Sequence, residues 1–261
     1  MIPLSDENPT VRPAVMTGLL LAAIGVVWVV VEGAGTGDRL VRAVCTLGLV
    51  PGELTGLAPL DSGVPIAPGL FCAVDAQPLN WLTPVLSMFL HGGWMHLLGN
   101  ALFLWVFGNN VEDVMGAARF VAFYLLCGLA AAGAHVAAAP ASVVPTVGAS
   151  GAISGVMGAY LLLFPRVRVR TFVTLPPIFF RVVVLPAWAL LVWWFVIQLW
   201  LGLPQLARTG EPTGGVAVWA HVGGFVAGVL LVRAFTRPDL VEARRRMLLQ
   251  RGLLQGVDGG T

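Results

Sequence analysis

Long apolar segments, separated by short polar joints, run along most of this chain. Each segment is long enough to cross the roughly 30 Å hydrocarbon core of a bilayer as a helix. The pattern predicts six spans, at residues 14–31, 92–110, 117–139, 147–164, 182–202 and 215–235. We therefore expect an all-α membrane protein, a six-helix bundle whose two ends lie on the same side of the membrane.

Three segments lie outside the predicted spans. Residues 1–13 are polar and contain prolines, which predicts a short unanchored tail. Residues 33–90 form a Gly- and Pro-rich first loop, and a loop of this size is expected to carry structure or function of its own. Residues 237–261 form a second tail, in which 240–254 mixes Leu, Met and Arg and fits either an amphipathic helix on the membrane surface or a solvated helix. The single domain between the tails covers 14–236.

The composition supports a membrane protein. Hydrophobic residues make up 57% of the 261 residues and charged residues 11%, and the mean hydropathy is +0.87. Soluble chains average about 25% charged residues, so a soluble globular domain is excluded. The formal net charge of +2 is small, and the basic residues are scattered between apolar segments, which argues against a nucleic-acid partner.

Arginine counts predict the orientation. The loop 165–181 carries four arginines and the tail after span six carries five. On the opposite side, the short loops 140–146 and 203–214 together contain a single arginine, Arg208. Because short cytoplasmic loops carry an excess of basic residues, we expect both termini in the cytoplasm and the large first loop, 33–90, on the extracytoplasmic side.

A serine between glycines stands at the head of span four, in the sequence Gly148-Ala149-Ser150-Gly151. Glycines leave room for a substrate backbone near the hydroxyl, and a helix that starts here points free N–H groups at whatever is bound. Both features suit a nucleophile that generates an oxyanion. The alternative is ordinary packing, because Gly and Ser spaced by four are common at membrane helix interfaces.

A serine nucleophile needs a base, and His221 lies about six residues into span six. Spans two, four and six run in the same direction, so residues near their starts share a depth, where an ionisable group is a functional candidate by default. Glycines beside this histidine, Gly224 among them, would let spans six and four pack closely. His135, near the outer end of span three, lies at a similar depth and is the alternative candidate for the base. Its simpler role is a helix–helix hydrogen bond. Because no acidic residue lies at this depth, we expect a Ser–His dyad.

Two further side chains in span two carry hydrogen-bond donors. His96 and Asn100 are four residues apart and therefore share one helix face. With the backbone N–H of Ser150, they could stabilise an oxyanion. His91 and His96 could suggest a metal, but they lie about 140° apart on a helix and no H-E-x-x-H motif is present. We expect neither a metal nor another cofactor.

The cysteines and tryptophans leave further questions. Cys45 and Cys72 lie in the first loop, where a disulfide and two free thiols are equally compatible with the sequence. Cys127 falls inside span three and is expected to pack. The tryptophans of span five are expected to face lipid or anchor the interface, and they are Trp188, Trp193, Trp194 and Trp200.

Taken together, these residues resemble the rhomboid intramembrane serine proteases over nearly the whole chain. The resemblance rests on Gly148-Ala149-Ser150-Gly151, on the His91…His96…Asn100 pattern, on Ala220-His221-Val222-Gly223-Gly224, and on six spans with a large first loop. It implies a bundle with a water-filled cavity open to the outside, and cleavage of transmembrane substrates near the outer leaflet. It implies Ser150 as nucleophile, His221 as general base, and His96, Asn100 and the Ser150 N–H as the oxyanion hole. Spans two and five would gate lateral access, and the supporting residues would be Gly148, Gly151, His91 and Gly224.

Two positions depart from the family pattern. Many members have Trp-Arg at the start of the first-loop motif, whereas Leu82 follows Trp81 here. Some members place an aromatic ring four residues after the serine, against the histidine, and that position is Ser154 here. The orientation of His221 must therefore come from other contacts.

Three classes of function remain open at this point. The first is a membrane serine endopeptidase of the bacterial cell membrane, with transmembrane proteins as substrates and membrane lipids around it. The second is a catalytically inactive relative that binds membrane clients, although such relatives usually lack the serine or the histidine. The third is a transporter or channel, which would show inverted repeats or broken helices in matching halves, and no convincing internal repeat is present. The sequence does not define the oligomeric state.

Overall fold

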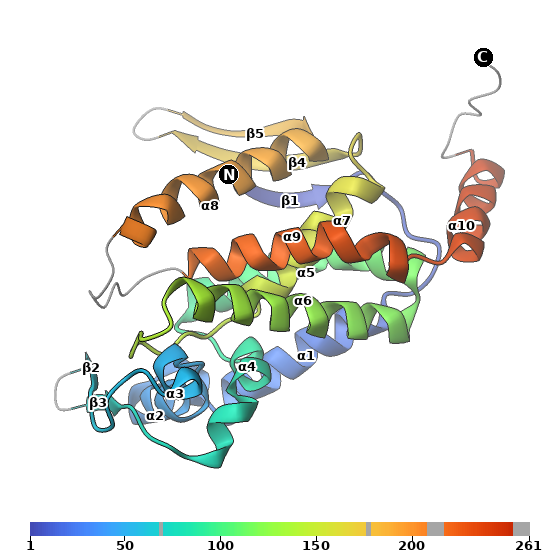
Figure 1. Cartoon of the computed structure of the whole chain (residues 1–261). Helices are drawn as coiled ribbons and strands as arrows, with labels where there is room; N and C mark the ends of the chain where they lie inside the picture. Colours follow the sequence, from blue (N-terminus) through green and yellow to red (C-terminus); the bar gives the residue numbers. More distant parts are fainter. Residues whose placement is uncertain (68–69, 176–178, 208–216, 253–261) are drawn as a thin grey trace.

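The chain folds into a mostly helical bundle, shown in Figure 1. The computed structural model describes residues 1–67, 70–175, 179–207 and 217–252. The principal helices are α1 (Val15–Val30), α5 (Trp94–Met115), α6 (Ala117–Ala138), α7 (Ser150–Leu163), α8 (Ala187–Ala207) and α9 (Val218–Phe235). Each corresponds to one of the six expected spans, with ends shifted by a few residues. The expected loop around Arg208 lies outside the described residues, at 208–216.

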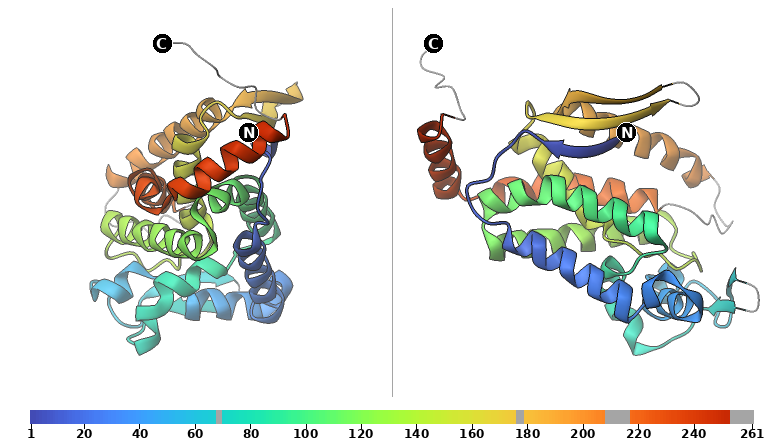
Figure 2. Two further views of the ribbon diagram at one scale, coloured as in Figure 1. Left: turned by 90° about the vertical axis from the view of Figure 1, so that its right-hand side faces the viewer. Right: turned by 180° about the vertical axis from the view of Figure 1, so that it is seen from behind.

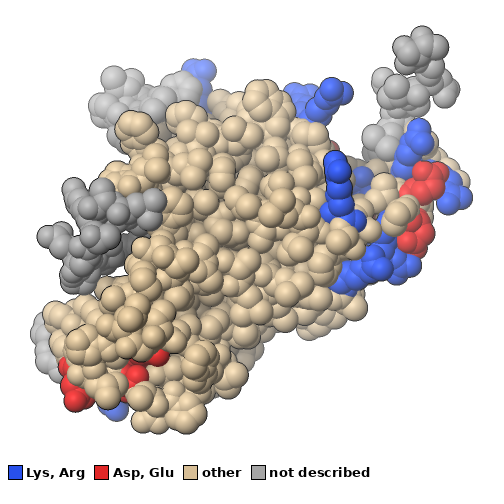
Figure 3. All heavy atoms as spheres, in the orientation of Figure 1, with Lys and Arg blue, Asp and Glu red and all other residues tan. Residues whose placement is uncertain are grey.

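Several of these helices suit a bilayer by length and composition. Within the described residues, three are long and apolar enough to cross a membrane: α6, α8 over Ala187–Pro204, and α9. Two shorter apolar helices, α1 and α7, accompany them. On the face shown in Figure 3, charged side chains gather at the two ends of the molecule and beside the β4–β5 hairpin, and the broad surface between them is uncharged. This distribution is that of a protein surrounded by lipid.

The helix α7 is the centre of the bundle. It contacts α5, α6, α8 and α9, and every residue from Gly151 to Tyr160 is buried. Small residues allow this burial: a Cβ added at Gly228 of α9 would lie 2.7 Å from the Cα of Gly155 in α7. On the other side, a Cβ added at Gly151 would lie 2.6 Å from the Cβ of Ala131 in α6. Backbone-to-backbone packing therefore holds α7 between α6 and α9.

A three-stranded antiparallel sheet corrects two expectations. Its strands are β1 (Ile2–Asp6), β4 (Arg168–Leu175) and β5 (Phe179–Pro186), in the order β1-β4-β5 (Figure 2). The prediction of an unanchored N-terminal tail is wrong, because β1 pairs with β4. The prediction that span five starts at 182 is also wrong, because α8 begins only at Ala187. The valines at 182–184 are β-branched and favour the strand, so the fold is mostly helical rather than all-α.

Buried charged side chains connect α1 and α10 (Pro238–Gln250) to α5. The helix α10 docks through Arg244, whose Nε lies 3.0 Å from Oδ2 of Asp113 at the end of α5. The neighbouring carboxylate of Glu112 accepts hydrogen bonds from the N–H and the Oγ1 of Thr17, both at 2.8 Å, and so caps the start of α1. Since Arg244 is 9% exposed, α10 is packed against the bundle here.

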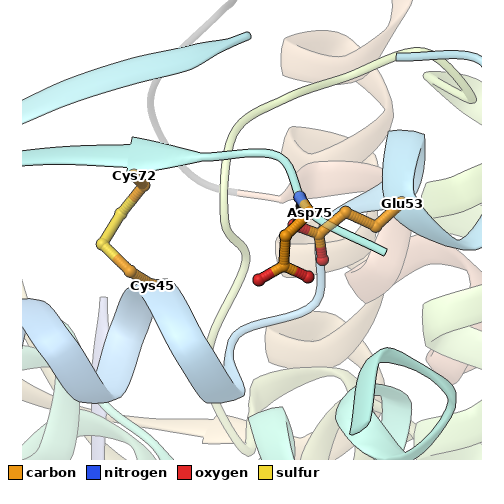
Figure 4. The surroundings of a disulfide bond; sticks show 4 residues. All are labelled: Cys45, Glu53, Cys72 and Asp75. Carbon is orange, nitrogen blue, oxygen red and sulfur yellow. Dashed lines mark hydrogen bonds between the residues drawn. A yellow bond between two sulfur atoms is a disulfide. The ribbon is translucent and has the colours of Figure 1, made fainter. Parts of the chain in front are cut away.

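The first loop has structure of its own. Its elements are η1 (Gly33–Gly35), α2 (Gly37–Leu47), α3 (Pro51–Thr55), β2 (Gly63–Ala67), β3 (Leu70–Ala73), η2 (Pro78–Leu82), α4 (Thr83–Leu86) and η3 (Ser87–Phe89). Cys45 and Cys72 form a disulfide that joins α2 to β3 (Figure 4). The Oε1 of Glu53 accepts a hydrogen bond from the N–H of Asp75 at 3.2 Å, next to this link. Buried Cys127 packs in α6, as expected.

Candidate active site

Ser150 and His221 meet where two helices begin. Ser150 is the first residue of α7, and His221 lies in the first turn of α9. The Oγ of Ser150 and the Nε2 of His221 are 2.8 Å apart, within hydrogen-bonding distance. Because Ser150 starts its helix, its backbone N–H is one of those that have no acceptor within the helix. The close packing of α7 and α9 described above brings the two side chains together.

Two residues of α8, which the sequence pattern does not assign to the site, hold the other side of the His221 ring. The Nδ1 of His221 lies 2.9 Å from the Oε1 of Gln198. The ring of Trp194, four residues earlier in α8, lies 5.7 Å from the His221 ring between centroids. Trp194 is therefore an exception to the expected lipid-facing role, whereas Trp188, Trp193 and Trp200 are more than half exposed.

His96 lies against Gly148, two residues before Ser150. Gly148 has φ +129, a conformation that side chains with a Cβ rarely adopt. A Cβ added there would lie 2.7 Å from the Nε2 of His96 and 3.5 Å from the Oγ of Ser150. Only glycine leaves space for the imidazole at this point, so the His96 ring approaches the Ser150 side of the site.

Asn100 lies one helical turn further along α5. It is 7% exposed, and its Nδ2 has no hydrogen-bond partner among the described residues. A buried amide donor costs free energy unless it donates a hydrogen bond to a protein group, a water or a bound molecule. This donor belongs to a residue that borders the same cavity as Ser150, so a bound group in the cavity could accept its hydrogen bond.

Behind His96 lies a buried pair that supports the start of α5. The backbone N–H of His91 donates to the Oε1 of Glu32 at 2.8 Å, and both residues are fully buried. Burial raises the pKa of Glu32 to about 7 and lowers the pKa of His91 to about 4. The rings of His91 and His96 are 5.1 Å apart between centroids, so His91 buttresses His96.

His135 borders the same cavity but has a different partner. Its Nε2 lies 2.9 Å from the Oγ1 of Thr146, a residue of the connection between α6 and α7. The two histidines at similar depth, both candidates for the base, thus have different partners: His221 contacts Ser150, and His135 contacts Thr146.

One cavity of about 640 Å³ connects these groups. Residues of the first loop, including Ser87 and Met88, form part of its wall. Its wall also includes the chemical groups singled out from the sequence: Ser150, His221, His96, Asn100 and His135. Within the described part of the chain, no three His, Cys, Asp or Glu side chains lie close enough together to hold a metal ion.

Comparison with known proteins identifies the family. The family model described as the Rhomboid domain matches residues 78–238, which include every residue of the site described above from α5 to α9. The chain belongs to the rhomboid family. This rhomboid is accordingly a multi-pass membrane protein.

Several curated relatives are similar to this rhomboid over part of its length. Rhomboid-like protease 5 of Toxoplasma gondii is 33% identical over 152 residues, which cover 56% of this chain and 15% of that protein. Rhomboid protease GluP of Bacillus subtilis (strain 168) is 42% identical over 80 residues, 31% of this chain and 15% of that protein. Rhomboid protein 1, mitochondrial, of Saccharomyces cerevisiae is 36% identical over 91 residues, 33% of this chain and 26% of that protein. The chain thus matches about a quarter or less of each of these three relatives.

The position four residues after the serine has a local role in this rhomboid. The Oγ of Ser154 donates to the carbonyl oxygen of Ser150 at 2.6 Å and does not reach the histidine. Contacts to the His221 ring come instead from α8, through Gln198 and Trp194. Position 154 has no aromatic residue to contact the His221 ring, and α8 supplies these contacts in its place.

Proposed function

We propose that this rhomboid is an intramembrane serine endopeptidase, a hydrolase that cleaves transmembrane segments of other membrane proteins. The observation that carries the proposal is the 2.8 Å contact between Ser150 and His221 on the wall of a cavity large enough for a peptide backbone. Protease is also the activity named for Rhomboid protease GluP and Rhomboid-like protease 5.

The reaction proceeds through an acyl-enzyme. The Ser150 hydroxyl gives its proton to the Nε2 of His221 as the Oγ bonds to the scissile carbonyl carbon. The carbonyl oxygen becomes an oxyanion, and the C–N bond breaks when His221 protonates the leaving amine. His221 then takes a proton from water as the water oxygen attacks the ester carbonyl, and it returns that proton to the Oγ of Ser150 as the acid product leaves.

Three donors surround the place where the oxyanion forms. They are the backbone N–H of Ser150, the ring N–H of His96 and the Nδ2 of Asn100, which has no partner among the described residues. Gly148 keeps the space beside the Ser150 hydroxyl free of a side chain, Gly151 lets α7 pack against α6, and Gly224 lets α9 bring His221 close. A single oxyanion donor typically contributes about 3–4 kcal/mol to the stabilisation of a transition state.

The proposal includes a location in the cell membrane, with six spans, both termini in the cytoplasm, and the site open to the extracytoplasmic side. The arginine distribution supports this orientation. The Cys45–Cys72 disulfide supports it independently, because disulfides persist where the compartment is oxidising, and this one lies in the first loop. Residues of the same loop border the cavity, so the loop and the opening of the site lie on one side.

Cleavage of a defined substrate tests the proposal. The protein is reconstituted in liposomes with a fluorophore-labelled transmembrane peptide, and products are identified by mass spectrometry. We expect cleavage by the wild type within the membrane-spanning part of the peptide and none by Ser150→Ala at equal reconstitution. Cleavage that persists in Ser150→Ala would assign the activity to another residue. A folded wild type that cleaves no peptide, while a positive-control rhomboid does, would support client binding or transport instead.

A further inference from the structure

We propose that Gln198 is a positioning residue that fixes the tautomer and the orientation of the His221 ring. This inference rests on the dyad proposed above. The Oε1 of Gln198 lies 2.9 Å from Nδ1, while the opposite ring nitrogen, Nε2, lies 2.8 Å from the Oγ of Ser150. An amide oxygen can only accept a hydrogen bond, so it holds the proton on Nδ1. Nε2 is then left with a lone pair directed at the Ser150 hydroxyl, which is the form that a base needs.

The surroundings of Gln198 show that its amide has a specific partner. Gln198 is 8% exposed, and it is part of a helix otherwise rich in Trp, Leu and Val. A buried amide in such a helix is costly unless it is hydrogen-bonded. Trp194 precedes it by four residues, and so both side chains lie on one helix face and contact the same imidazole. A neutral acceptor thus takes the place that an acidic residue holds in a three-residue catalytic triad.

Three variants separate this role from simple packing. Gln198→Met keeps the length of the side chain and removes the amide oxygen, and Gln198→Glu keeps an oxygen at the same reach. Val196→Ala is the matched control, because Val196 is on the same helix and 49% exposed. We measure kcat and KM for the liposome-embedded peptide, together with the melting temperature. Loss of the acceptor is expected to lower kcat roughly 10- to 100-fold with little change in KM, which is the effect typical of losing a hydrogen bond that orients a metal-binding histidine.

The conservative variant Gln198→Glu distinguishes an orienting role of Gln198 from a packing role. We expect Gln198→Glu to recover most of the kcat that Gln198→Met loses, and Val196→Ala to match the wild type. Equal kcat for wild type and Gln198→Met would overturn the inference while leaving the proposed function intact. A folded Gln198→Glu as slow as Gln198→Met would overturn it too. If Gln198→Met does not fold, Gln198→Asn takes its place, because its oxygen is one methylene short and the same loss is expected.

We also infer, from an independent observation, that β1 is a strap that narrows the lipid-side access to Ser150 between α5 and α8. A small crevice of about 50 Å³ lies at this seam, and Met1, next to β1, is part of its wall. Phe103 of α5, Met157 of α7 and Trp194 of α8 border both this crevice and the large cavity. These three side chains therefore separate the cavity from the place that Met1 covers.

The sheet also connects α5 to α8. The strand β1 packs against α5, and the Oδ2 of Asp6 accepts hydrogen bonds from the Nδ2 of Asn110 at 2.8 Å and from the hydroxyl of Tyr160 at 2.5 Å. At the other edge of the sheet, β5 ends at Pro186 and α8 begins at the next residue. As Figure 2 shows, the sheet runs alongside the bundle next to α8. A transmembrane substrate that approaches through this seam meets β1, whereas a small reagent within the cavity does not.

Comparison of a large and a small substrate tests the strap, on the basis of the proposed function. We measure kcat/KM for the transmembrane peptide and the rate of Ser150 labelling by a small fluorophosphonate, in a variant that lacks residues 2–7. The second variant is Ser5→Pro, since proline disrupts a strand, and the control is Thr10→Pro, outside β1. We expect peptide cleavage to rise roughly threefold or more while labelling stays nearly constant, because the barrier removed is one of access.

The ratio of the two rates decides whether β1 acts as a strap. An unchanged ratio in both β1 variants, each folded by its melting curve, would overturn the strap. A ratio that rises equally in Thr10→Pro would also overturn it, because the effect would then not come from β1. A wild type that fluorophosphonate does not label contradicts the proposed function itself, which distinguishes that failure from failure of the strap.

Discussion

The Nε2 of His135 and the Oγ1 of Thr146 are 2.9 Å apart on the wall of the cavity that contains Ser150. Thr146 lies in the connection that leads into α7, and its backbone also pairs with Leu49 of the first loop. His135 therefore fastens α6 to this connection. By the same geometry it is not available to Ser150, whose partner is His221.

This pairing predicts that His135→Ala keeps catalytic activity. The variant loses one partly buried hydrogen bond, so we expect a loss of about 1 kcal/mol in the free energy of unfolding. Cleavage of the transmembrane peptide per folded molecule should stay close to that of the wild type. Thr146→Val removes the same hydrogen bond from the other side and is the matched control. Loss of cleavage in a folded His135→Ala would contradict the assignment of the base.

Asn100→Ala should lower activity without lowering stability. Its Nδ2 has no partner among the described residues, so the folded state loses no hydrogen bond when the amide is removed. If the amide binds the oxyanion, kcat falls by roughly 10²- to 10³-fold. Asn80→Ala is the control, because its Nδ2 is 2.9 Å from the Oδ1 of Asp75, and its loss should affect stability instead. A kcat for Asn100→Ala equal to that of the wild type would remove Asn100 from the oxyanion hole.

Gly228→Ala should destabilise the bundle. The added Cβ would lie 2.7 Å from the Cα of Gly155, so α9 and α7 would have to separate. Overpacking of this kind typically costs about 1–3 kcal/mol. Gly25→Ala in α1 is the matched control, because nothing lies within 4 Å of the position of its Cβ. Melting temperatures of the two variants in one detergent check the prediction, and an unchanged value for Gly228→Ala would contradict the close packing.

The buried carboxyl group of Glu32 should make the free energy of unfolding depend on pH. Burial raises its pKa to about 7, from an ordinary value of 4.5, so the folded protein holds a proton that the unfolded chain has lost over this range. The free energy of unfolding should therefore fall as the pH rises from about 5 to about 7, by roughly 1–3 kcal/mol, and then level off. The neighbouring His91 stays neutral there, because burial lowers its pKa to about 4.

Glu32→Gln isolates this contribution. Its amide oxygen can still accept the hydrogen bond from the N–H of His91, and it does not titrate. We expect the melting temperature of this variant to vary less between pH 5 and pH 8 than that of the wild type. Identical slopes in the two proteins would show that another group controls the pH dependence.

The sequence predicts elements whose signal is local. Uninterrupted apolar runs produce α6 and α9 close to their expected bounds, and the glycine-flanked Ser150 lies at a helix start as expected. The valines at 182–184 extend an apolar run, and hydropathy does not distinguish a strand from a span there. β1 escapes prediction because its partner strand, β4, lies more than 160 residues away, and nothing in the polar segment 1–13 marks that pairing.

The same limit applies to the site. Ser150 and His221 stand in recognisable glycine-rich surroundings, which is why the sequence predicts both as site residues. Gln198 is a single amide in a Trp-rich helix, and its role depends on how α8 packs against α9. An acidic side chain is the usual third member of a triad, whereas here a neutral amide oxygen accepts the Nδ1 proton, and no motif marks such a residue.

Labelling by a fluorescent fluorophosphonate tests the Ser150–His221 dyad most directly, because the reagent bonds only to an activated serine. Wild type, Ser150→Ala and His221→Ala are compared after liposome reconstitution at equal amounts of folded protein. We predict labelling of the wild type, with the modified peptide containing Ser150, and none in either variant. Labelling of Ser150 that persists in folded His221→Ala would contradict the dyad, and an unlabelled wild type beside a labelled control rhomboid would contradict serine catalysis altogether.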